Sequence, residues 1–396
     1  MKTIRQLDLR DKRVLVRVDF NVPQDKTTRA VTDDTRLRAA LPTIRYLIER
    51  GARVILVSHL GRPDGQVVEK LRLDPVATRL SQILGQPVKK VNDCVGPEAK
   101  EAVQNLKPGE VLLLENLRFH EEEEKNDPGF SKALASLADA YVNDAFGTAH
   151  RAHASTVGVA GLLPAAAGFL MEKEIEALTG ALKNPARPFA ALIGGAKVSS
   201  KIKVLENLAA RVDGLFIGGA MACTFLKAQG YEMGRSLVED DQMDSALRIV
   251  KDAKGRGVNF VLPVDAVVAN RIEADAQWAV TPVSAVPKDS YVLDIGPATI
   301  SLFEDQLRPH KTVLWNGPMG VFELAPFASG TRAMAAFLAD LPANTIVGGG
   351  ESVAAVEEMG LAGRFSHVST GGGATLEFIE GRVLPGVAAL GKCAHE

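Results

Sequence analysis

Residues 14–22 read VLVRVDFNV, a short run of aliphatic and β-branched residues that contains Asp19 and Asn21 at its carboxyl end. Similar runs follow at RVILVSHLG (53–61), VLLLENLRF (111–119) and AYVNDAF (140–146). A segment with apolar residues at helical spacing follows each run, and repetition of this unit is typical of a parallel α/β sheet. The runs are almost continuously hydrophobic, as expected for strands that helices cover on both faces.

The pattern repeats in the second half of the chain. Its runs are FAALIGGAK (189–197), GLFIGGAM (214–221), NFVLPVDAVVA (259–269), SYVLDIG (290–296), TVLWNG (312–317), NTIVGGG (344–350) and HVSTGGG (367–373). One further run, VKKVND (88–93), belongs to the first half. Both halves are therefore predicted to be doubly wound, Rossmann-like parallel-sheet domains of the α/β class.

A helix is predicted between the two halves, because apolar residues recur at helical spacing from Phe169 to Leu182 and the pattern ends before Pro185. The chain has 396 residues, and domains much above 250 residues usually split. We expect an N-terminal domain at 1–169, a hinge helix at 170–184 and a C-terminal domain at 185–379. The alternative is a surface helix inside one large domain.

The composition excludes several classes of protein. The 46 Lys and Arg residues nearly balance 48 Asp and Glu residues, so no global field attracts nucleic acid or an anionic membrane. Cys94, Cys223 and Cys393 lie far apart without a CxxC motif, which argues against a disulfide framework and a structural zinc site. The charged N-terminus is unlike a signal peptide, so we expect a soluble cytoplasmic protein. The acidic run Glu121–Glu124 is interpreted as a solvated loop or helix start.

Charged side chains follow the strands of the first half, where ligands of open α/β sheets bind. Together with Arg36, which comes from the segment DDTRLR, the candidates are Asp19, Asn21, His59, Arg62, Arg118, His150, Arg151 and His153. Guanidinium groups bind carboxylates and phosphates bidentately, so this set suits a small ligand with more than one negative charge. For any single arginine, a surface ion pair is the alternative interpretation.

Glycines follow the strands of the second half, as in Gly194-Gly195, Gly218-Gly219 and Gly348-Gly349-Gly350. Glycine lets the backbone approach a ligand, and amides at a helix N-terminus bind phosphate. Lys197 and Lys201 lie four residues apart, so they could reach phosphate oxygens from one face of a helix start. These features predict a nucleotide site, with a solvated lysine pair as the alternative.

Familiar motifs do not account for this site. The segment GVAALGKC (386–393) has Cys393 where a P-loop needs Ser or Thr, and DFN (19–21) is not DFG. A two-lobed glycosyltransferase would share the architecture but would not need four arginines in the first half. A two-lobed anion-binding protein would usually be exported.

Eight strings closely resemble the phosphoglycerate kinase family, in one order along essentially the whole chain. They are VRVDFNVP (16–23), SHLGRP (58–63), ENLRF (115–119), AHRAHAS (149–155), GGAKVSSK (194–201), WNGPMGVFE (315–323), GGGES (348–352) and STGGGAT (369–375). The resemblance implies a monomeric enzyme that interconverts 1,3-bisphosphoglycerate plus ADP with 3-phosphoglycerate plus ATP, using Mg²⁺, without nucleic-acid or membrane partners. It also implies that the C-terminal tail, 380–396, packs on the first domain.

The resemblance implies roles for individual residues. Those expected to hold the triose are Asp19, Asn21, Arg36, His59, Arg62, Arg118 and Arg151. Those expected at the nucleotide are Gly195, Lys197, Lys201, Gly219, Asn316, Pro318, Val321, Glu323, Gly349, Gly350, Glu351 and Ser352. Arg36, Lys197 and Lys201 are the expected catalytic residues.

Two positions depart from the family pattern. The chain has Glu351 where the family usually has an Asp that binds the metal, and Ser200 where many members have Asp between the two lysines. Mg²⁺ requires near-ideal octahedral geometry at about 2.1 Å, so the longer side chain changes how a metal could be held. Glu351 remains the predicted metal ligand.

Overall fold

The computed structural model describes residues 1–391, and the chain forms two compact units. The first unit contains Met1–Ile175 together with the C-terminal residues from Val383, and the second contains Glu176–Arg382. The boundary lies inside helix α6 (Phe169–Lys183), which corresponds to the helix expected at 170–184. The last five residues of the predicted tail, 392–396, lie outside the described residues.

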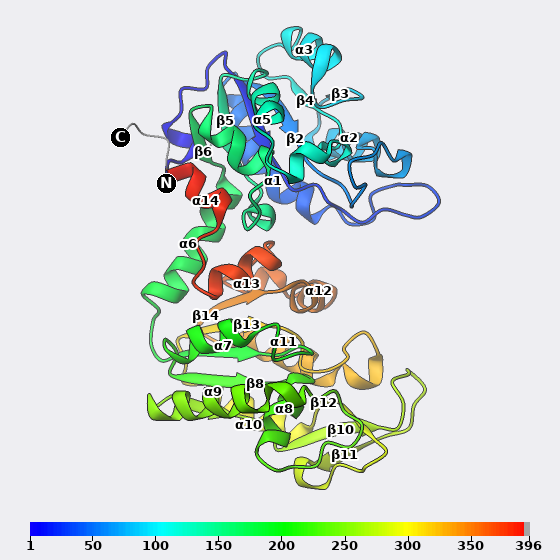
Figure 1. The fold of residues 1–396 in the computed structure, drawn as a ribbon, viewed down its shortest axis with the longest axis vertical. Coiled ribbons are helices and arrows are strands. Elements are labelled where there is room, and N and C mark those ends of the chain that lie inside the picture. Colours follow the sequence, from blue (N-terminus) through cyan, green and yellow to red (C-terminus); the bar gives the residue numbers. More distant parts are fainter. Residues whose placement is uncertain (392–396) are drawn as a thin grey trace. The chain divides into compact units, whose positions relative to one another are not determined.

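The first unit has a parallel six-stranded sheet in the order β3-β4-β2-β1-β5-β6 (Figure 1). Its strands are β1 (Arg13–Arg17), β2 (Arg53–Val57), β3 (Val88–Lys90), β4 (Val111–Leu113), β5 (Ala140–Asn143) and β6 (Ala165–Ala167). Its helices besides the start of α6 are α1 (Thr35–Glu49), α2 (Asp74–Leu84), α3 (Gly96–Gln104), α4 (Glu121–Glu124), α5 (Pro128–Ala135) and α14 (Pro385–Gly391).

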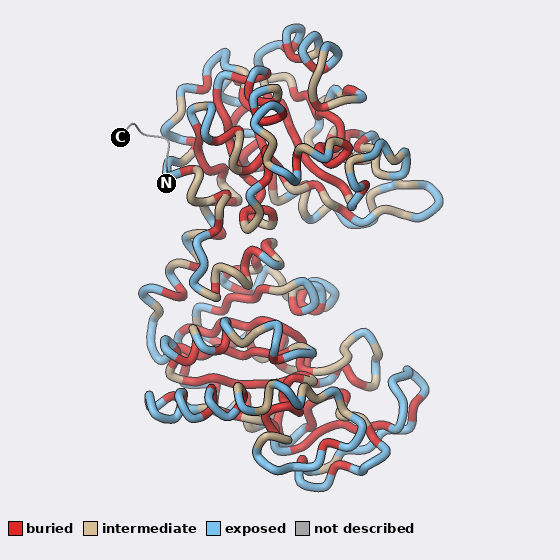
Figure 2. The backbone as a smooth tube through the Cα atoms, in the orientation of Figure 1, coloured by how far each residue is buried: buried red, intermediate tan, exposed pale blue. Residues whose placement is uncertain are grey.

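The hydrophobic core explains why these segments pair. Val14 lies opposite Val54 in the β1–β2 register, and both are completely buried. They pack in one cluster with Ile44 and Leu47 of the amphipathic helix α1. Figure 2 shows the central strands as buried segments surrounded by exposed loops and helix faces. Within the same unit, the Gly386 amide of α14 donates to the Ala149 carbonyl at 2.8 Å.

The second unit contains two sheets. A parallel six-stranded sheet has the order β15-β14-β13-β7-β8-β9, and an antiparallel sheet has the order β11-β10-β12. The strands are β7 (Phe189–Ile193), β8 (Gly214–Ile217), β9 (Asn259–Val261), β10 (Asp265–Ala269), β11 (Trp278–Pro282), β12 (Tyr291–Ile295), β13 (Thr312–Asn316), β14 (Asn344–Gly348) and β15 (His367–Val368). The helices are α7 (Ile202–Ala209), α8 (Met221–Ala228), α9 (Met243–Gly255), α10 (Pro297–Leu307), α11 (Ser329–Asp340), α12 (Gly350–Glu358) and α13 (Gly373–Ile379).

Two details of the sequence interpretation were wrong, and a third was only partly confirmed. The run 259–269 forms two strands, β9 and β10, in different sheets, with Pro263 between them. The run 290–296 forms β12 of the antiparallel sheet, because buried hydrophobicity does not encode strand direction. The acidic run does form a helix, α4, as one of its two interpretations expected. It is not fully solvated, since Glu123 is completely buried and accepts hydrogen bonds from Ser155.

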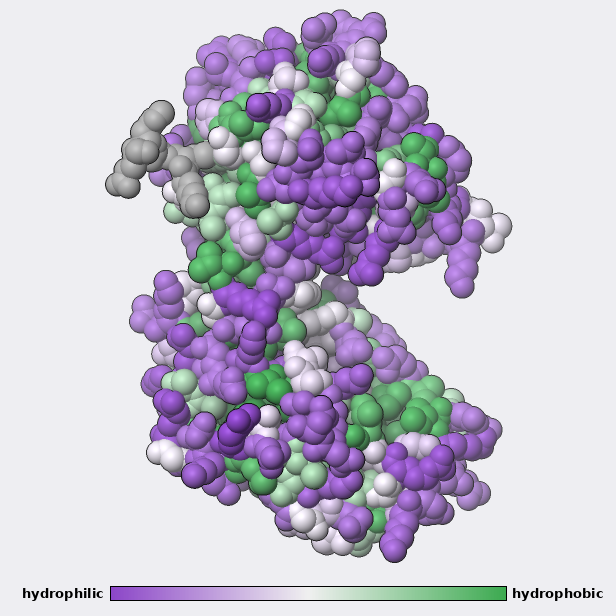
Figure 3. Space-filling model, viewed as in Figure 1, coloured by the Kyte–Doolittle hydropathy of each residue, from purple (hydrophilic) through white to green (hydrophobic). Residues whose placement is uncertain are grey.

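No helix among residues 1–391 is both long enough and apolar enough to span a membrane. On the face of the molecule shown in Figure 3, hydrophilic residues cover most of the surface of each unit.

Candidate functional site

The carboxyl edge of the first sheet gathers most of the charged residues predicted for the first half. Asp19 follows β1, His59 follows β2, and Arg118 lies in the short 3-10 helix Leu117–Phe119 after β4. The loops are tied by their own polar side chains. The Ser58 hydroxyl accepts the Phe20 amide at 2.9 Å, and the Asn116 side chain accepts the amide of Arg118 at 3.1 Å.

Arg36 reaches this edge from the first turn of α1. Its Nη1 donates to Asp19 Oδ2 at 2.9 Å, and Asp19 Oδ1 lies 3.9 Å from His59 Nδ1. The Asp19 side chain is 12% exposed, whereas that of Arg36 is 40% exposed. The carboxylate therefore orients a guanidinium that solvent or a ligand can still reach.

Gly61 connects a second pair of predicted residues. Its amide donates to Asn21 Oδ1 and its carbonyl accepts from Arg118 Nη1, both at 2.9 Å. Glu124 lies beside two arginines, 3.1 Å from Arg118 Nε and 3.9 Å from Arg151 Nη1. Arg62 is exposed and adjoins this group through its chain neighbour Gly61.

The arginines share one electrostatic environment. Burial lowers the pKa of His59 well below its usual value, and the charges of Arg17, Arg118, Arg36 and Arg151 lower it further. Burial and the same kind of charges lower the pKa of His153 to about 3. Both imidazoles are therefore neutral at pH 7, and the positive charge of the edge comes from guanidinium groups.

A buried network that sequence reasoning missed supports this edge. Arg17 is buried at the end of β1, where its Nε donates to Ser155 Oγ at 2.9 Å and its Nη2 donates to His59 Nδ1 at 3.2 Å. Ser155 in turn donates to the buried Glu123 carboxylate through its hydroxyl, at 2.5 Å, and its amide, at 2.9 Å. Burial raises the pKa of Glu123, and the Arg17 charge opposes that shift. The available signal was Arg17 itself, a charged residue within an apolar run.

The carboxyl edge of the parallel sheet in the second unit is built mainly from backbone. Gly194 follows β7 and donates its amide to the carbonyl of Asn316, the last residue of β13, at 3.0 Å. Gly219, with φ +68°, lies so close to Gly195 that an added Cβ would be 2.5 Å from the Gly195 nitrogen. Glycine is required at position 219 because both its conformation and its contact exclude a side chain.

Lys201 and Asn316 meet at this edge. Lys201 Nζ donates to Asn316 Oδ1 at 2.8 Å and to the Gly194 carbonyl at 2.7 Å. Asn316 Nδ2 donates to the Gly348 carbonyl at 3.0 Å, so it also ties β13 to β14. Burial lowers the pKa of Lys201 to about 8, and the Glu351 charge opposes the shift.

Two neighbouring pockets contain most of the nucleotide-site residues predicted from the sequence. One has apolar walls that include Ala222, Leu226, Val283 and Val292, and the predicted residues along it are Gly195, Gly219, Pro318, Val321, Glu323 and Glu351. The other is lined by Lys201, Asn316, Gly317, Gly349, Gly350, Glu351, Gly372, Gly373 and Leu376. Glu351 belongs to both.

The remaining predicted nucleotide-site residues differ in placement. Ser352 is buried, and its hydroxyl accepts the Gly317 amide at 2.7 Å, which fixes the loop after β13. Lys197 is exposed and lines neither pocket, so the structure does not bring it together with Lys201.

Comparison with known proteins identifies the family. The family model described as phosphoglycerate kinase matches residues 4–382. The phosphoglycerate kinase of Moorella thermoacetica is 63% identical over 388 residues, covering 98% of each chain, and that of a Roseiflexus species is 60% identical over 391 residues, again covering 98% of each.

Solved structures agree over nearly the full length. The phosphoglycerate kinase structure from Coxiella burnetii has a TM-score of 0.90 at 43% identity and covers 99% of both chains. That from Pyrococcus horikoshii has a TM-score of 0.86 at 36% identity and covers 99% of this chain and 98% of its own. With an arginine-rich edge on one parallel sheet and a glycine-rich edge on the other, this chain belongs to the phosphoglycerate kinase family.

Proposed function

We propose that the two sheet edges are the two halves of the site for the reaction this chain catalyses, phosphoryl transfer between 1,3-bisphosphoglycerate plus ADP and 3-phosphoglycerate plus ATP. The first unit binds the triose and the second binds the nucleotide. The observation that carries this assignment is the placement of Arg36, Arg118 and Arg151 at one sheet edge, with Arg36 held by Asp19 and with Arg118 and Arg151 beside Glu124. Such a set suits a ligand that carries both a carboxylate and a phosphate.

The geometry supports a proposed contact with the triose for each residue. Arg118 and Arg151 are partly neutralised by Glu124, so a phosphate group could replace that carboxylate as their partner. Arg62 completes the set as an exposed guanidinium next to Gly61. Asp19 and Asn21 supply acceptors for the hydroxyl of the triose, while Asp19 also orients Arg36.

The nucleotide half divides between the two pockets. Apolar walls around Leu226 and Val292 suit the base, and Glu323 at the same pocket suits the ribose hydroxyls. The glycine amides and the Lys201 ammonium suit the phosphates. Lys197 is exposed in the segment that precedes α7. It would contact the transferred group only when substrate is bound.

The reaction needs positioning and charge neutralisation rather than a general base. In the direction that consumes ATP, a carboxylate oxygen of 3-phosphoglycerate attacks the γ-phosphorus, and the bond to the bridging oxygen breaks with its electron pair leaving on ADP. With a reference pKa near 4, that carboxylate is already ionised at pH 7. Arg36 and Lys201 stabilise the negative charge on the transferring group from either side.

The residues present fit a magnesium ion. Glu351 offers one exposed carboxylate in the first turn of α12, between the two pockets. Mg²⁺ is commonly bound by one or two carboxylates plus substrate phosphates and water. When bound with nucleotide, the ion would neutralise phosphate charge, and the extra methylene of Glu351 suits contact through a water molecule.

Placement of the two substrates on separate units requires that the units bring them together. We propose that bending near α6 and near residues 375–385, where the chain returns to the first unit, provides this movement. Closure of this kind also excludes water from the acyl phosphate. We further propose that the chain is a cytoplasmic monomer without nucleic-acid or membrane partners, which is supported by its net charge of −2.

The Glu351→Gln and Glu351→Asp variants test the metal assignment. Glu351→Gln should raise the Mg²⁺ concentration needed for half-maximal ATP-dependent formation of 1,3-bisphosphoglycerate by about tenfold, since second-sphere metal contacts are typically worth 10–100-fold. Glu351→Asp should retain activity. Calorimetric binding of ADP with and without Mg²⁺ gives a readout that does not depend on turnover.

Glu358→Gln is the matched control, because Glu358 is an exposed residue of the same helix, 3.7 Å from Arg332. If Glu351→Gln changes only the melting temperature, Glu351 merely stabilises the helix N-terminus, an effect of about 0.3–1 kcal/mol. The ion would then be held by nucleotide and water alone.

A further inference from the structure

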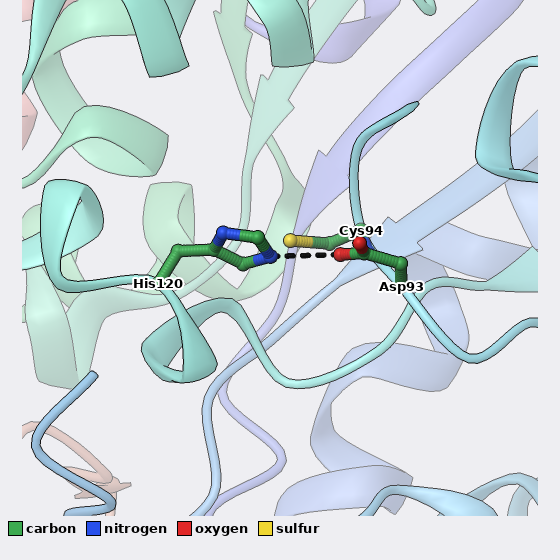
Figure 4. Close-up of side chains that lie close together, drawn as sticks. All are labelled: Asp93, Cys94 and His120. Atoms are coloured by element: carbon green, nitrogen blue, oxygen red, sulfur yellow. Dashed lines mark hydrogen bonds and ion pairs between the residues drawn. The ribbon is translucent and has the colours of Figure 1, made fainter. Parts of the chain in front are cut away.

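A cluster of Asp93, Cys94 and His120 lies in the first unit and is separate from the arginine contacts of the triose site (Figure 4). Asp93 and Cys94 belong to the loop between β3 and α3, and His120 directly follows the 3-10 helix after β4. Because β3 and β4 are neighbouring parallel strands, their carboxyl ends bring these segments together. His120 Nε2 lies 2.7 Å from Asp93 Oδ1, and one ligand atom from each of the three residues lies within 4.8 Å of the others.

We propose that this cluster binds a thiophilic divalent cation, with Zn²⁺ as the best fit, through the Cys94 thiolate, the His120 imidazole and the Asp93 carboxylate. Sulfur, nitrogen and oxygen donors of these types are the usual protein ligands of zinc, and three protein ligands leave a fourth position for water. Tetrahedral ligands at zinc distances are about 3.3–3.6 Å apart. The three ligand atoms already lie within 4.8 Å of one another, so side-chain rotations would be enough to reach that spacing.

The surroundings favour a cation with access from solvent. The Cys94 thiol is buried, whereas the side chains of Asp93 and His120 are 45% and 28% exposed. The thiol is therefore the innermost of the three groups, and the other two are accessible to solvent. In Figure 4 the thiol and the carboxylate both point toward the same edge of the imidazole ring. Burial raises the pKa of the Cys94 thiol well above its usual value, the negative charges of Asp93, Glu123 and Glu115 raise it further, and a bound cation would oppose these effects.

Two of these carboxylates already interact with cations. Glu115 is bound by Lys90 at 2.5 Å and Arg72 at 3.1 Å, and the Arg17 charge acts on Glu123. Asp93 instead pairs with His120, and its Oδ1 also accepts the Cys94 amide at 2.6 Å. The second Asp93 oxygen is therefore the one that suits a metal ion. Binding would exchange the hydrogen bond between Asp93 and His120 for bonds to the cation.

The site would cross-link two loops at the edge that carries Arg118, only two residues before His120. Its donor set differs from the single Glu351 carboxylate proposed for Mg²⁺. No sequence motif indicates it, because Cys94 and His120 lie 26 positions apart instead of at a motif spacing. Its existence does not depend on the assignment of the substrate sites.

Co²⁺ titration of metal-stripped protein tests the proposal directly, in a Cys393→Ser background that removes the thiol near the C-terminus. We expect one equivalent of Co²⁺ to produce a thiolate charge-transfer absorption that Zn²⁺ abolishes by competition. Zn²⁺ should also raise the melting temperature. Cys94→Ser should abolish the charge-transfer band, and Asp93→Asn and His120→Gln should each weaken Co²⁺ binding by at least about tenfold.

Cys223→Ser is the matched control, since Cys223 is also a buried thiol but lies in the second unit. It should leave the band unchanged, and near-native melting temperatures of the metal-free variants show that lost binding is not lost folding. The proposal is overturned if the band is absent or persists in Cys94→Ser. It is equally overturned if Asp93→Asn and His120→Gln, both folded, bind Co²⁺ as tightly as the parent.

Discussion

In the proposed function, each of the two sheet edges binds a polyanion, and the two edges would do so with different chemistry. In the first unit, polar side chains hold cationic side chains in place: Asp19 accepts from Arg36, and the buried Glu123 holds Ser155, which accepts from Arg17. In the second unit, glycines bring backbone groups together, and Lys201 is the charged side chain at their centre. The difference predicts that the first edge is sensitive to charge and the second to added volume.

Arg36→Ala should have the largest effect, because Arg36 is oriented by Asp19 and remains exposed toward a ligand. We expect kcat to fall by about 10²-fold or more with a smaller change in triose KM, as for a group that acts mainly on the transition state. Steady-state kinetics in the direction that consumes ATP measure both. Arg38→Ala, on the same helix but paired with Asp34, should retain near-normal kcat. A normal kcat with a raised KM would make Arg36 a simple anchor.

Gly219→Ala should have the next largest effect and should act on the nucleotide alone. The new Cβ would meet the Gly195 backbone at 2.5 Å, so the loops after β7 and β8 must separate. We expect nucleotide KM to rise by about tenfold, equivalent to about 1.4 kcal/mol. Gly230→Ala is the control, because Gly230 also has positive φ but has nothing within 4 Å of an added Cβ.

Both glycine variants carry the backbone strain of a left-handed residue, about 1–2 kcal/mol, so both should lower the melting temperature. Only Gly219→Ala should also raise nucleotide KM. A similar rise in Gly230→Ala would attribute the effect to general loss of stability.

A smaller effect on the nucleotide KM is expected from a change of pH. Since the pKa of Lys201 is lowered to about 8, the free enzyme loses this positive charge as pH rises through 8. Nucleotide KM should therefore rise between pH 7 and 9, by up to about tenfold if only the ammonium form binds. Triose KM should change less, because guanidinium groups stay protonated. Lys201→Arg should flatten the nucleotide profile, and an unchanged slope in that variant would remove Lys201 as its cause.

Sequence reasoning found the features that strand order determines. Parallel strands place their carboxyl ends at one edge, so the gathering of Asp19, His59 and Arg118 was predictable from three separate runs. It missed the features that depend on tertiary burial. Glu123 belongs to an acidic run that the sequence suggests is exposed. In the structure it is buried, accepts a hydrogen bond from Ser155 and interacts electrostatically with Arg17. Strand β12 has the same hydrophobic character as the parallel strands, and only its pairing with β10 makes it antiparallel.

At the second edge, the sequence predicts the backbone features better than the side-chain contacts. The close backbone approach at Gly195 and Gly219 was predictable, because glycine is the residue that permits such contacts and positive φ angles. The contact of Lys201 with Asn316, 115 residues away, could not be predicted in this way. The spacing of the two lysines gives no reason to distinguish Lys197 from Lys201.

Reciprocal calorimetry on the full chain tests the separation of the substrate sites most directly. Arg118→Met and Lys201→Met each remove one buried or partly buried cation, from the first and the second unit respectively. Arg118→Met should weaken 3-phosphoglycerate binding by at least about tenfold, since a charged hydrogen-bond partner contributes about 1.5–3 kcal/mol, and leave Mg·ADP binding unchanged. Lys201→Met should do the reverse. If either folded variant lost both ligands, or lost the ligand assigned to the other unit, the division of the substrates between the two edges would be wrong.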